Sequence, residues 1–569
     1  MEIIVKYLDI WIFFCTFASK IINYMKRVHK IWLIVISVVV AVFVGLFIGA
    51  DVLVSRFVQK KVGAALANIP GCEAQCGDIH VFLFSGTAEV NGLRFVYHGK
   101  PVSKRDTIGP GVEVSVDKLV VGRVFYTMLL QKRVLVSDVR IIRPAVEVWL
   151  DDKHPDACFP KIEDKGLEKA DKKLVDAEVQ RFHLKNANAR LHSLRTQLDV
   201  RVDSCSLTAH NLRYDSVFSY NDSVYDFSLE HAAVMLPDGR MHIETNNIEQ
   251  KDQGKLTIGR TRVNHTMNRR RLGELVKEPV TWMDLRVESV QTSPFNPIRK
   301  VLAKDYTLES LKVVVEKMDV FRDNRRQPTH TYPMPQEAIL KAKEPFRIGV
   351  VNAEIKQIDI ALATTDVNCG EMHLKKISAS VQNITNKRGE TMSINGSCPI
   401  GKGKAKAEIA LTMNRSCDFA CHMNVTDADA DFLNPFIRPL VGISFDMVVD
   451  EIETRYKGNS ISSNGTFKLL YHGLKVQVHK EDDIPFKVVT KNANTITQLA
   501  NTLVPKSNPS TVDIRPREYD VEWKRDEWKP FPLYMFGPCI DGVKKTMLPG
   551  LNVHKQTKSR KSKVESRKG

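Results

Sequence analysis

A period-two alternation of apolar and polar residues is the feature that most constrains what this chain can fold into. In the stretch VEVSVDKL, Val112, Val114 and Val116 fall on one side of an extended chain, and the polar residues between them fall on the other. This pattern predicts strands with one wet face. It recurs at Val81–Phe84, Leu93–Tyr97, Val134–Ile142, Ala145–Leu150, Phe182–Leu191, Leu311–Phe321, Ile348–Ile360, Met372–Ile384, Ala405–Met413, Ser460–Tyr471 and Leu474–His479.

Helical periodicity is rare by comparison, and it is confined to short segments that connect strands. We therefore predict a mainly β, largely antiparallel fold with few short helices. The candidate helices are Gly166–Val175, Arg271–Leu275, Pro297–Ala303, Pro335–Lys341, Phe432–Leu440 and Thr495–Leu503.

The length of 569 residues is too great for a single compact core, which indicates several domains or a repetitive architecture. Phe182–Leu191 and Ile348–Gln357 are similar in sequence and suggest two repeated β regions. We place the first at 71–323 and the second at 346–545, joined by the Pro-containing connection 324–345. The charged stretch Asp151–Lys173 is a second predicted connection.

An uncharged apolar run precedes the β regions. Twenty helical residues span about 30 Å, so the run is long enough to cross a bilayer and predicts a transmembrane anchor within 25–51. Basic residues before the run predict a cytoplasmic N-terminus and an exported remainder. A cleaved signal peptide is the alternative, and residues 1–24 form a leader of uncertain start. The anchor residues include Ile31, Trp32, Phe43, Phe47 and Ala50.

Residues 52–70 follow the anchor and place apolar residues at helical spacing, with basic residues on another face. This pattern predicts an amphipathic helix that ends at Pro70. Such a helix could lie on the membrane surface or cap the first strands of the sheet.

The chain is basic, with 83 Lys and Arg residues against 66 Asp and Glu residues and a formal charge of +17. An anionic partner is therefore expected. Much of the excess lies in the segment 546–569, where seven Lys or Arg residues face one Glu, and this composition predicts a disordered tail. Because the folded body is only mildly basic, we expect no nucleic-acid partner.

The sequence contains no nucleophile elbow, no phosphate-binding Gly-rich loop and no His-Glu-x-x-His motif. We expect no enzymatic activity, no catalytic residues, no cofactor and no metal. Two cysteine pairs, Cys72 with Cys76 and Cys417 with Cys421, have the same spacing. Disulfides are favoured for them in an exported chain, and we predict a Cys72–Cys76 bond at a Gly-flanked turn, while metal binding remains an alternative. The remaining exported cysteines could equally be buried thiols; they are Cys158, Cys205, Cys369, Cys398 and Cys539.

Three lysines, Lys402, Lys404 and Lys406, alternate along one predicted strand. They indicate either an edge strand protected against aggregation or a weak contact with anionic lipid headgroups.

The order of anchor, amphipathic helix and strands resembles the AsmA-like family, the bacterial relatives of the repeating β-groove, bridge-like lipid transfer proteins. GTAEVNGLRFVYHG and VEVSVDKLVVGRVFYTMLLQKRVLVSDVRIIRPAVEVWLDD are similar to the opening strands of that family. FRDNRRQP, PFRIGVVNAEIKQIDI, GEMHLKKISASVQNITN and GNSISSNGTFKLLYHGLKVQVHKEDD resemble its later strand series. The chain is shorter than the longest bridging members and has a lysine-rich tail.

The resemblance implies an elongated, curled β-groove on a single-pass inner-membrane protein, with the bulk of the chain in the periplasm. Such a groove would shield or transfer phospholipids and so support outer-membrane biogenesis. The alternative is an anchored structural or assembly factor with a filled β-sandwich that binds envelope proteins. Candidate lining residues are Val112, Val114, Val116, Val146, Val148, Leu150, Ile348, Val350, Ile409 and Leu411.

Overall fold

The structure is a computed structural model, and it forms two compact units. The N-terminal unit comprises Phe14–Thr266 and Ser289–Asp305, and the C-terminal unit comprises Met1–Phe13, Met267–Glu288 and Tyr306–Gly569. Each unit is considered by itself. The described residues are 55–60, 71–82, 85–101, 109–125, 133–159, 176–214, 224–251, 254–276, 278–295, 306–364, 369–479, 493–510 and 514–548.

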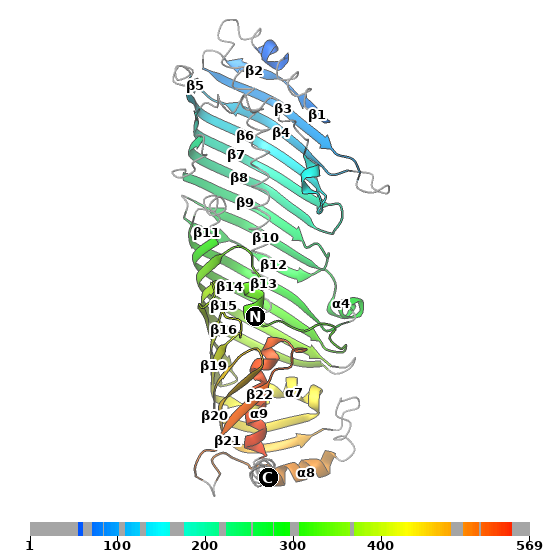
Figure 1. Cartoon of the computed structure of the whole chain (residues 1–569), viewed down its shortest axis with the longest axis vertical. Coiled ribbons are helices and arrows are strands. Elements are labelled where there is room, and N and C mark those ends of the chain that lie inside the picture. The colour runs from blue at the N-terminus through cyan, green and yellow to red at the C-terminus, as the bar shows by residue number, and fades with distance from the viewer. Residues whose placement is uncertain are drawn as a thin grey trace, which may run out of the picture. The chain divides into compact units, whose positions relative to one another are not determined.

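The described strands of the N-terminal unit form one hydrogen-bonded ladder that broadly follows chain order (Figure 1). The short strands share partners: β1 and β2 both pair with β3, β5 pairs with β6 beside β4, and β11 and β12 both pair with β10. All of the pairs are antiparallel except β6 with β7, which is parallel. The strands are β1 (Cys72–Cys76), β2 (Ile79–Phe82), β3 (Thr87–His98), β4 (Gly111–Val121), β5 (Val124–Phe125), β6 (Arg133–Leu150), β7 (Asp176–Ser193), β8 (Asp199–Tyr214), β9 (Val224–Met235), β10 (Met241–Gln250), β11 (Lys255–Ile258) and β12 (Thr261–His265).

The strand β13 (Val280–Pro294) has residues in both units. In the C-terminal unit the strands from β14 onward again pair in chain order, antiparallel except for the parallel pair β14 and β15. They are β14 (Tyr306–Asp323), β15 (Phe346–Ala363), β16 (Cys369–Thr385), β17 (Thr391–Ile400), β18 (Gly403–Thr412), β19 (Phe419–Asp429), β20 (Ile443–Gly458), β21 (Ser462–Val478) and β22 (Glu518–Lys524).

The two similar segments lie at equivalent places in the topology. Phe182–Leu191 lies in β7 and Ile348–Gln357 lies in β15, and each of these strands is the second member of its unit's parallel pair. The two predicted connections, Asp151–Lys173 and 324–345, fall between the members of these pairs. The segment 324–345 thus lies inside the C-terminal unit, because β14 pairs directly with β15.

A line of left-handed residues crosses the ladder of the N-terminal unit. Non-glycine residues rarely adopt positive φ, and in strands such positions mark bulges that shift the alternation of side chains. The register passes from one of these residues to the next across the ladder, and we call this line the crease. Its members are Gly92 of β3, Arg143 of β6, Asn186 of β7, Ser204 of β8 and Asn247 of β10, with φ between 49° and 70°.

Short helices cover parts of the C-terminal unit. They are α4 (Arg269–Val276), α6 (Pro335–Leu340), α7 (Asn434–Val441), α8 (Ala493–Leu503) and α9 (Phe531–Met547). The sequence predictions for the first four are confirmed, whereas α9 was not predicted because Pro532, Gly537 and Pro538 obscure its periodicity. The predicted helices Gly166–Val175 and Pro297–Ala303 lie outside the described residues.

The best-filled core lies where α8 and α9 pack on the last strands. Phe467, Leu469 and Tyr471 of β21 are each about 1% exposed and pack with Val521 of β22. The helices complete this cluster with Ala500 of α8, Val504 just after α8, and Cys539 and Val543 of α9. In this part of the unit, one sheet and two helices form a filled two-layer core.

The mainly β prediction is confirmed. The predicted anchor and the leader 1–24 lie outside the described residues. Of the predicted tail 546–569, Thr546 and Met547 are the last residues of α9, and residues after 548 lie outside the described ranges. None of the helices in the described ranges has both the length and the apolar content needed to cross a membrane.

Of the predicted amphipathic helix, residues 55–60 are described and are helical. The main-chain N–H of Val81 donates to Ser55 Oγ at 3.1 Å, and Gln59 Nε2 donates to the oxygen of Gly77 at 3.3 Å. Val58 is 1% exposed. This short helix therefore caps the first strands, which was one of the two roles considered for it.

Candidate functional site

An unbroken row of apolar side chains crosses the N-terminal unit. Residues that lie opposite each other on paired strands point to the same face of the sheet, so the register identifies the row directly. The row contains one residue from each of eight strands that pair in succession, β3, β4, β6 to β10 and β12, and we call it the N-terminal apolar row. Its members are Tyr97, Val112, Val148, Leu191, Val200, Val234, Ile243 and Val263.

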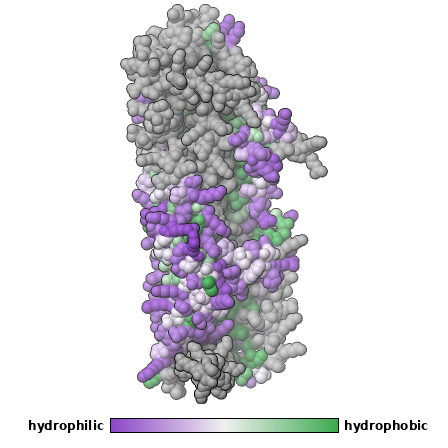
Figure 2. Space-filling view, in the orientation of Figure 1, coloured by the Kyte–Doolittle hydropathy of each residue, from purple (hydrophilic) through white to green (hydrophobic). Residues whose placement is uncertain are grey.

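The neighbouring row on the opposite face is mostly charged. Its members are Glu113, Glu147, Arg190, Arg201, Ala233, Glu244 and Arg262, and ion pairs connect this face across the strands. His192 lies between Asp199 and Glu147 at 2.5 and 3.2 Å, for example. Hydrophilic side chains cover most of the coloured surface in Figure 2. Each strand thus separates an apolar face from a solvated one.

The C-terminal unit has an equivalent row through nine strands, which we call the C-terminal apolar row. Its face is half-buried at Leu311, Val351, Ile394 and Ile409, but Cys421, Tyr456 and Val521 are 2–3% exposed. The helix α9 covers only the last strands, but Val381 of β16 is also buried, at 5% exposed. The members are Leu311, Val351, Val381, Ile394, Ile409, Cys421, Tyr456, Gly465 and Val521.

Most of the predicted lining residues belong to these apolar faces. Val112, Val114 and Val116 lie opposite Val148, Val146 and Pro144, so they form a single patch on β4 and β6. Val114, Val146, Val148, Leu150 and Ile409 are half-buried, whereas Val112, Val116 and Ile348 are buried. The structure therefore brings together the residues predicted near the start of the chain, and it places Ile409 in the C-terminal apolar row.

Val350 is a correction. It lies opposite the exposed Gln382 of β16 and is in phase with the exposed Asn352. The alternation shifts between Ile348 and Val351, so Val351 takes the place on the apolar face that we expected for Val350. The adjacent pair of valines hid this shift in the sequence.

Leu411 is a second correction, because it is 0% exposed and its neighbours in the register pack in an aromatic cluster. It lies between Met392 and Phe419 in the register, and both of those residues are also buried. Phe419 packs edge-on against Phe531 and Tyr534, with ring centroids 5.6 and 5.5 Å away. Leu411 thus belongs to a filled aromatic cluster.

The three predicted headgroup lysines, Lys402, Lys404 and Lys406, are all exposed, but they lie away from the apolar face. Lys404 and Lys406 alternate with half-buried alanines along β18, so they point to the opposite side. The strand β18 lies between β17 and β19, which excludes the edge-strand interpretation. Lipid held on the apolar face would not meet these ammonium groups.

The predicted Cys72–Cys76 disulfide is wrong for this structure, and Cys417 and Cys421 are also free thiols. Cys72 and Cys76 occupy the two ends of the extended strand β1, and four strand steps separate them by about 13 Å. A disulfide needs Cα atoms within about 7 Å. Burial raises the pKa of Cys72 and of Cys421 to about 11.

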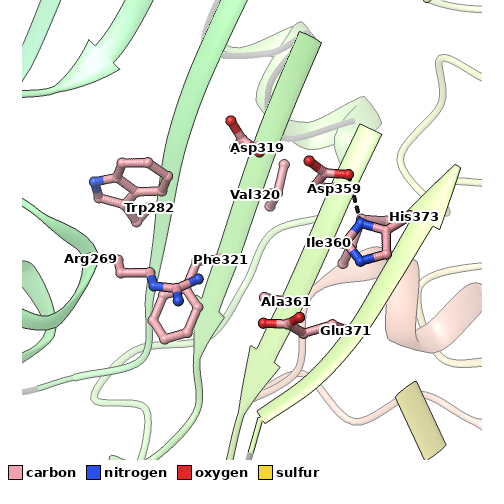
Figure 3. Close-up of a pocket in the computed structure, with 10 residues that line it drawn as sticks. All are labelled: Arg269, Trp282, Asp319, Val320, Phe321, Asp359, Ile360, Ala361, Glu371 and His373. Carbon is pink, nitrogen blue, oxygen red and sulfur yellow. Dashed lines mark hydrogen bonds and ion pairs between the residues drawn. The ribbon is translucent and has the colours of Figure 1, made fainter. Parts of the chain in front are cut away.

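A cavity of about 180 Å³ lies between α4 and the strands β13–β16 (Figure 3). Lys317 Nζ bridges Asp319 and Asp359 at 2.9 and 2.8 Å, and His373 Nδ1 lies 2.7 Å from Asp359. Burial would raise the pKa of Asp359, but hydrogen bonds from Lys317 and His373 lower it overall. Asp359 is thus held ionised and paired, which suits a structural ion network better than proton transfer.

The other walls of this cavity are aromatic and cationic. The Arg269 guanidinium lies over the Phe321 ring at 5.1 Å, and Trp282 Nε1 donates to the oxygen of Met267 at 2.8 Å. Each of these groups is engaged within the unit. The cavity shows no nucleophile next to a base, which an acyl- or phosphoryl-transfer site would require.

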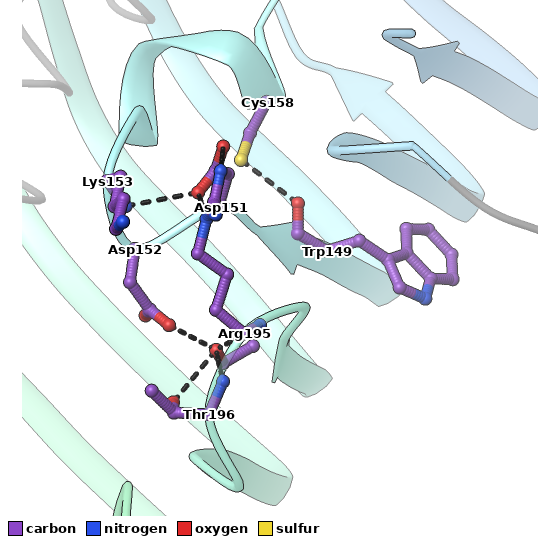
Figure 4. Close-up of polar contacts among 8 residues, drawn as sticks. Trp149, Asp151, Asp152, Lys153, Cys158, Arg195 and Thr196 are labelled. Atoms are coloured by element: carbon purple, nitrogen blue, oxygen red, sulfur yellow. Dashed lines mark hydrogen bonds and ion pairs between the residues drawn. The ribbon is translucent and has the colours of Figure 1, made fainter. Parts of the chain in front are cut away.

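A polar clamp closes the end of the parallel pair in the N-terminal unit (Figure 4). The buried carboxylate of Asp151 accepts two hydrogen bonds from the Arg195 guanidinium, through Nε and, at 3.0 Å, through Nη2. These bonds lower the pKa of Asp151 to about 2. The buried Cys158 donates from Sγ to the oxygen of Trp149 at 3.0 Å. The clamp fixes the ends of β6 and β7 and provides no reactive pair.

No cluster of three or more His, Cys, Asp or Glu side chains in the described ranges is placed to hold a metal ion. Comparison with protein-family models, with curated proteins and with solved structures finds no match. The candidate site therefore rests on the two apolar faces.

Half of the N-terminal apolar row lay in segments that sequence reasoning did not identify as strands. Val200, Val234, Ile243 and Val263 are separated by many polar residues, as in DVRVDSCSLTAHNLRY, so their alternation is weak. The detectable signal is a step of three residues where the crease interrupts the alternation, such as Leu229 to Ala232 in β9.

Proposed function

We propose that this protein shields or transfers phospholipids along a groove formed by the apolar faces of its sheet, as the resemblance to AsmA-like proteins implies. The observation that carries the proposal is the N-terminal apolar row, which runs without a polar residue through eight strands. Acyl chains need such a continuous apolar path, because each polar interruption would cost desolvation energy.

Burial varies along the N-terminal apolar row. Five members are half-buried, whereas Val112, Val234 and Val263 are buried. Several central-strand residues, including Val114, Val146 and Val148, stay half-buried, whereas the core under α9 is filled. Leaving such side chains partly in water forfeits part of the roughly 1.5–3 kcal/mol that full burial of each would contribute. A lipid chain lying on this face would recover that energy.

The alternative is an assembly factor with a filled β-sandwich. A sandwich needs two facing sheets, and the described strands of each unit belong to a single ladder. In the C-terminal unit, filled packing lies beneath α8 and α9, and buried apolar residues such as Val234 and Val263 also occur in the described part of the N-terminal unit. The single ladder favours the lipid proposal. The resemblance adds to the proposal that this is an inner-membrane protein with a periplasmic groove that supports outer-membrane homeostasis.

The test introduces acidic residues on one face only. In the full-length protein, Val114→Asp with Val148→Asp places two carboxylates on the apolar face. The control is Ser115→Asp, which lies on the opposite face of the same strand and diagonal to Glu147, so it reproduces the same charge arrangement there.

Each form is purified in mild detergent, and both co-purifying phospholipid and protease resistance are measured. We expect the apolar-face variant to remain folded and to lose most of its lipid, while the control keeps its lipid. A wild-type protein that never carries lipid would refute the proposal. Loss of protease resistance before any difference in lipid would favour the assembly-factor alternative.

A further inference from the structure

The helix α9 has two apolar sides, and only one of them packs on the sheet. Tyr534 and Met535 are buried against the last strands, and Gly542 lies against Phe467. On the outer side, Leu533, Phe536 and Ile540 are 43%, 55% and 45% exposed.

The outer residues form one continuous stripe. Positions spaced three and four residues apart lie on the same side of a helix, so Leu533, Phe536 and Ile540 are adjacent, and Lys544 continues the line. A single exposed apolar residue needs no explanation, but a contiguous group of large ones marks a surface that binds a partner or a membrane.

The charge next to the stripe indicates which partner fits. Lys544 is exposed in the last turn of the helix, whereas Lys545 is paired with Asp541 at 2.7 Å. The segment 549–569 that follows has seven Lys or Arg residues against one Glu. An apolar helical face beside a dense basic segment is the combination that binds anionic bilayers, because the apolar side chains insert among the lipids while the cations attract the headgroups.

We infer that the outer stripe of α9 docks this end of the C-terminal unit on an anionic lipid surface. Leu533, Phe536 and Ile540 enter the interface, and the basic segment after α9 binds the headgroups. A second copy of the chain fits this surface less well, since two segments of the same positive charge would be brought together. The inference does not depend on lipid binding by the apolar rows.

The experiment measures vesicle capture by the full-length protein. The protein is exchanged into a nonionic amphipol and immobilised through an N-terminal tag. Dye-filled vesicles of phosphatidylcholine, with or without phosphatidylglycerol, are then added. The wild type should capture the anionic vesicles and leave the neutral ones, and salt should weaken the capture.

Two sets of variants separate the contributions of the stripe and of the charge. Phe536→Ser with Ile540→Ser should lower capture about tenfold, whereas Leu275→Ser, an equally exposed leucine on α4, should have no effect. Lys558→Gln, Lys561→Gln and Lys563→Gln should also lower capture, and they leave every residue of α9 unchanged.

Equal capture by the wild type and by both sets of variants would overturn the inference, as would equal capture of neutral and anionic vesicles. A dimer in amphipol that Phe536→Ser dissociates, with no vesicle capture, would assign the stripe to a second copy instead. Loss of lipid from the Val114→Asp and Val148→Asp protein with vesicle capture intact would show that the two proposals stand separately.

Discussion

The hydroxyl of Tyr456 on β20 donates a hydrogen bond to the main-chain oxygen of Met535 on α9. Tyr456 also belongs to the C-terminal apolar row, opposite Cys421. Burial raises the pKa of this phenol, which therefore stays protonated and keeps donating at every physiological pH. One side chain thus joins the apolar face of the sheet to the helix that covers its end.

Replacing Tyr456 with Phe should weaken the attachment of α9 to the sheet without opening a cavity. The ring keeps its packing, and the lost hydrogen bond should cost about 1 kcal/mol. We expect faster protease cleavage between β22 and α9, with cleavage in the N-terminal unit unchanged. Unchanged cleavage throughout would mean that the bond contributes little to holding α9.

The contact between α9 and β21 allows no side chain at Gly542. A Cβ added there would lie 2.1 Å from the Phe467 ring, whereas a Cβ at Gly396 would find its nearest neighbour 3.9 Å away. Gly542→Ala should destabilise the C-terminal unit by about 1–3 kcal/mol through overpacking, even though alanine favours helices. Gly396→Ala is the matched control and should be nearly neutral. Thermal unfolding of both variants checks this, and equal melting temperatures would contradict the packing of α9.

The sequence was sufficient to predict the class of the fold, because alternation reports which side of a strand is apolar. It located the two crossovers as well, since charged or Pro-containing segments interrupt the strands there. The sequence prediction failed at Lys402, Lys404 and Lys406. Alternating lysines give the same sequence pattern on an edge strand and on the solvated face of a central strand. Only the pairing of β18 with both neighbours distinguishes these cases.

The candidate site was predictable where strict alternation holds, as at Val112, Val114 and Val116. The prediction of lining residues failed where the alternation shifts, as at Val350, because one extra residue moves all following side chains to the other face. It failed again at Leu411, since alternation identifies an apolar face and does not show what covers it. The covering helix α9 contains two prolines, which hid it from a search for helical periodicity.

The clamp between Asp151 and Arg195 should make the N-terminal unit sensitive to acid. The Asp151 pKa is lowered to about 2, so its contribution to stability is complete above the unfolded value of about 3.9 and is lost as the pH falls toward 2. Arg195→Gln should cost about 2 kcal/mol at neutral pH, because a buried carboxylate loses its cation.

Arg201→Gln is the control for that prediction, because its partner Asp203 lies with it on the exposed polar face. Exposed pairs contribute about 1 kcal/mol or less. Denaturant unfolding at pH 7 and pH 3 should show a large loss for the first variant at pH 7 and a smaller one at pH 3. Equal losses for the two variants would mean that the clamp behaves as an ordinary surface pair.

The crease gives the last prediction, because its residues adopt a backbone conformation that β-branched side chains avoid. Asn247 of β10 is exposed and has φ of 57°. Asn247→Val should destabilise the N-terminal unit by about 1–2 kcal/mol, whereas Asn247→Gly, which tolerates positive φ, should change stability by less than about 0.5 kcal/mol. The same Asn→Val change at the exposed Asn352 of β15, which has ordinary strand φ, should be neutral or slightly stabilising. The free energy of unfolding of the three variants tests whether the positive φ at Asn247 is needed for the shift in side-chain alternation along β10. If Asn247→Val changed stability no more than Asn352→Val, the positive φ at position 247 would not depend on the type of residue there. The step of three residues in the apolar pattern would then be enough to cause the crease.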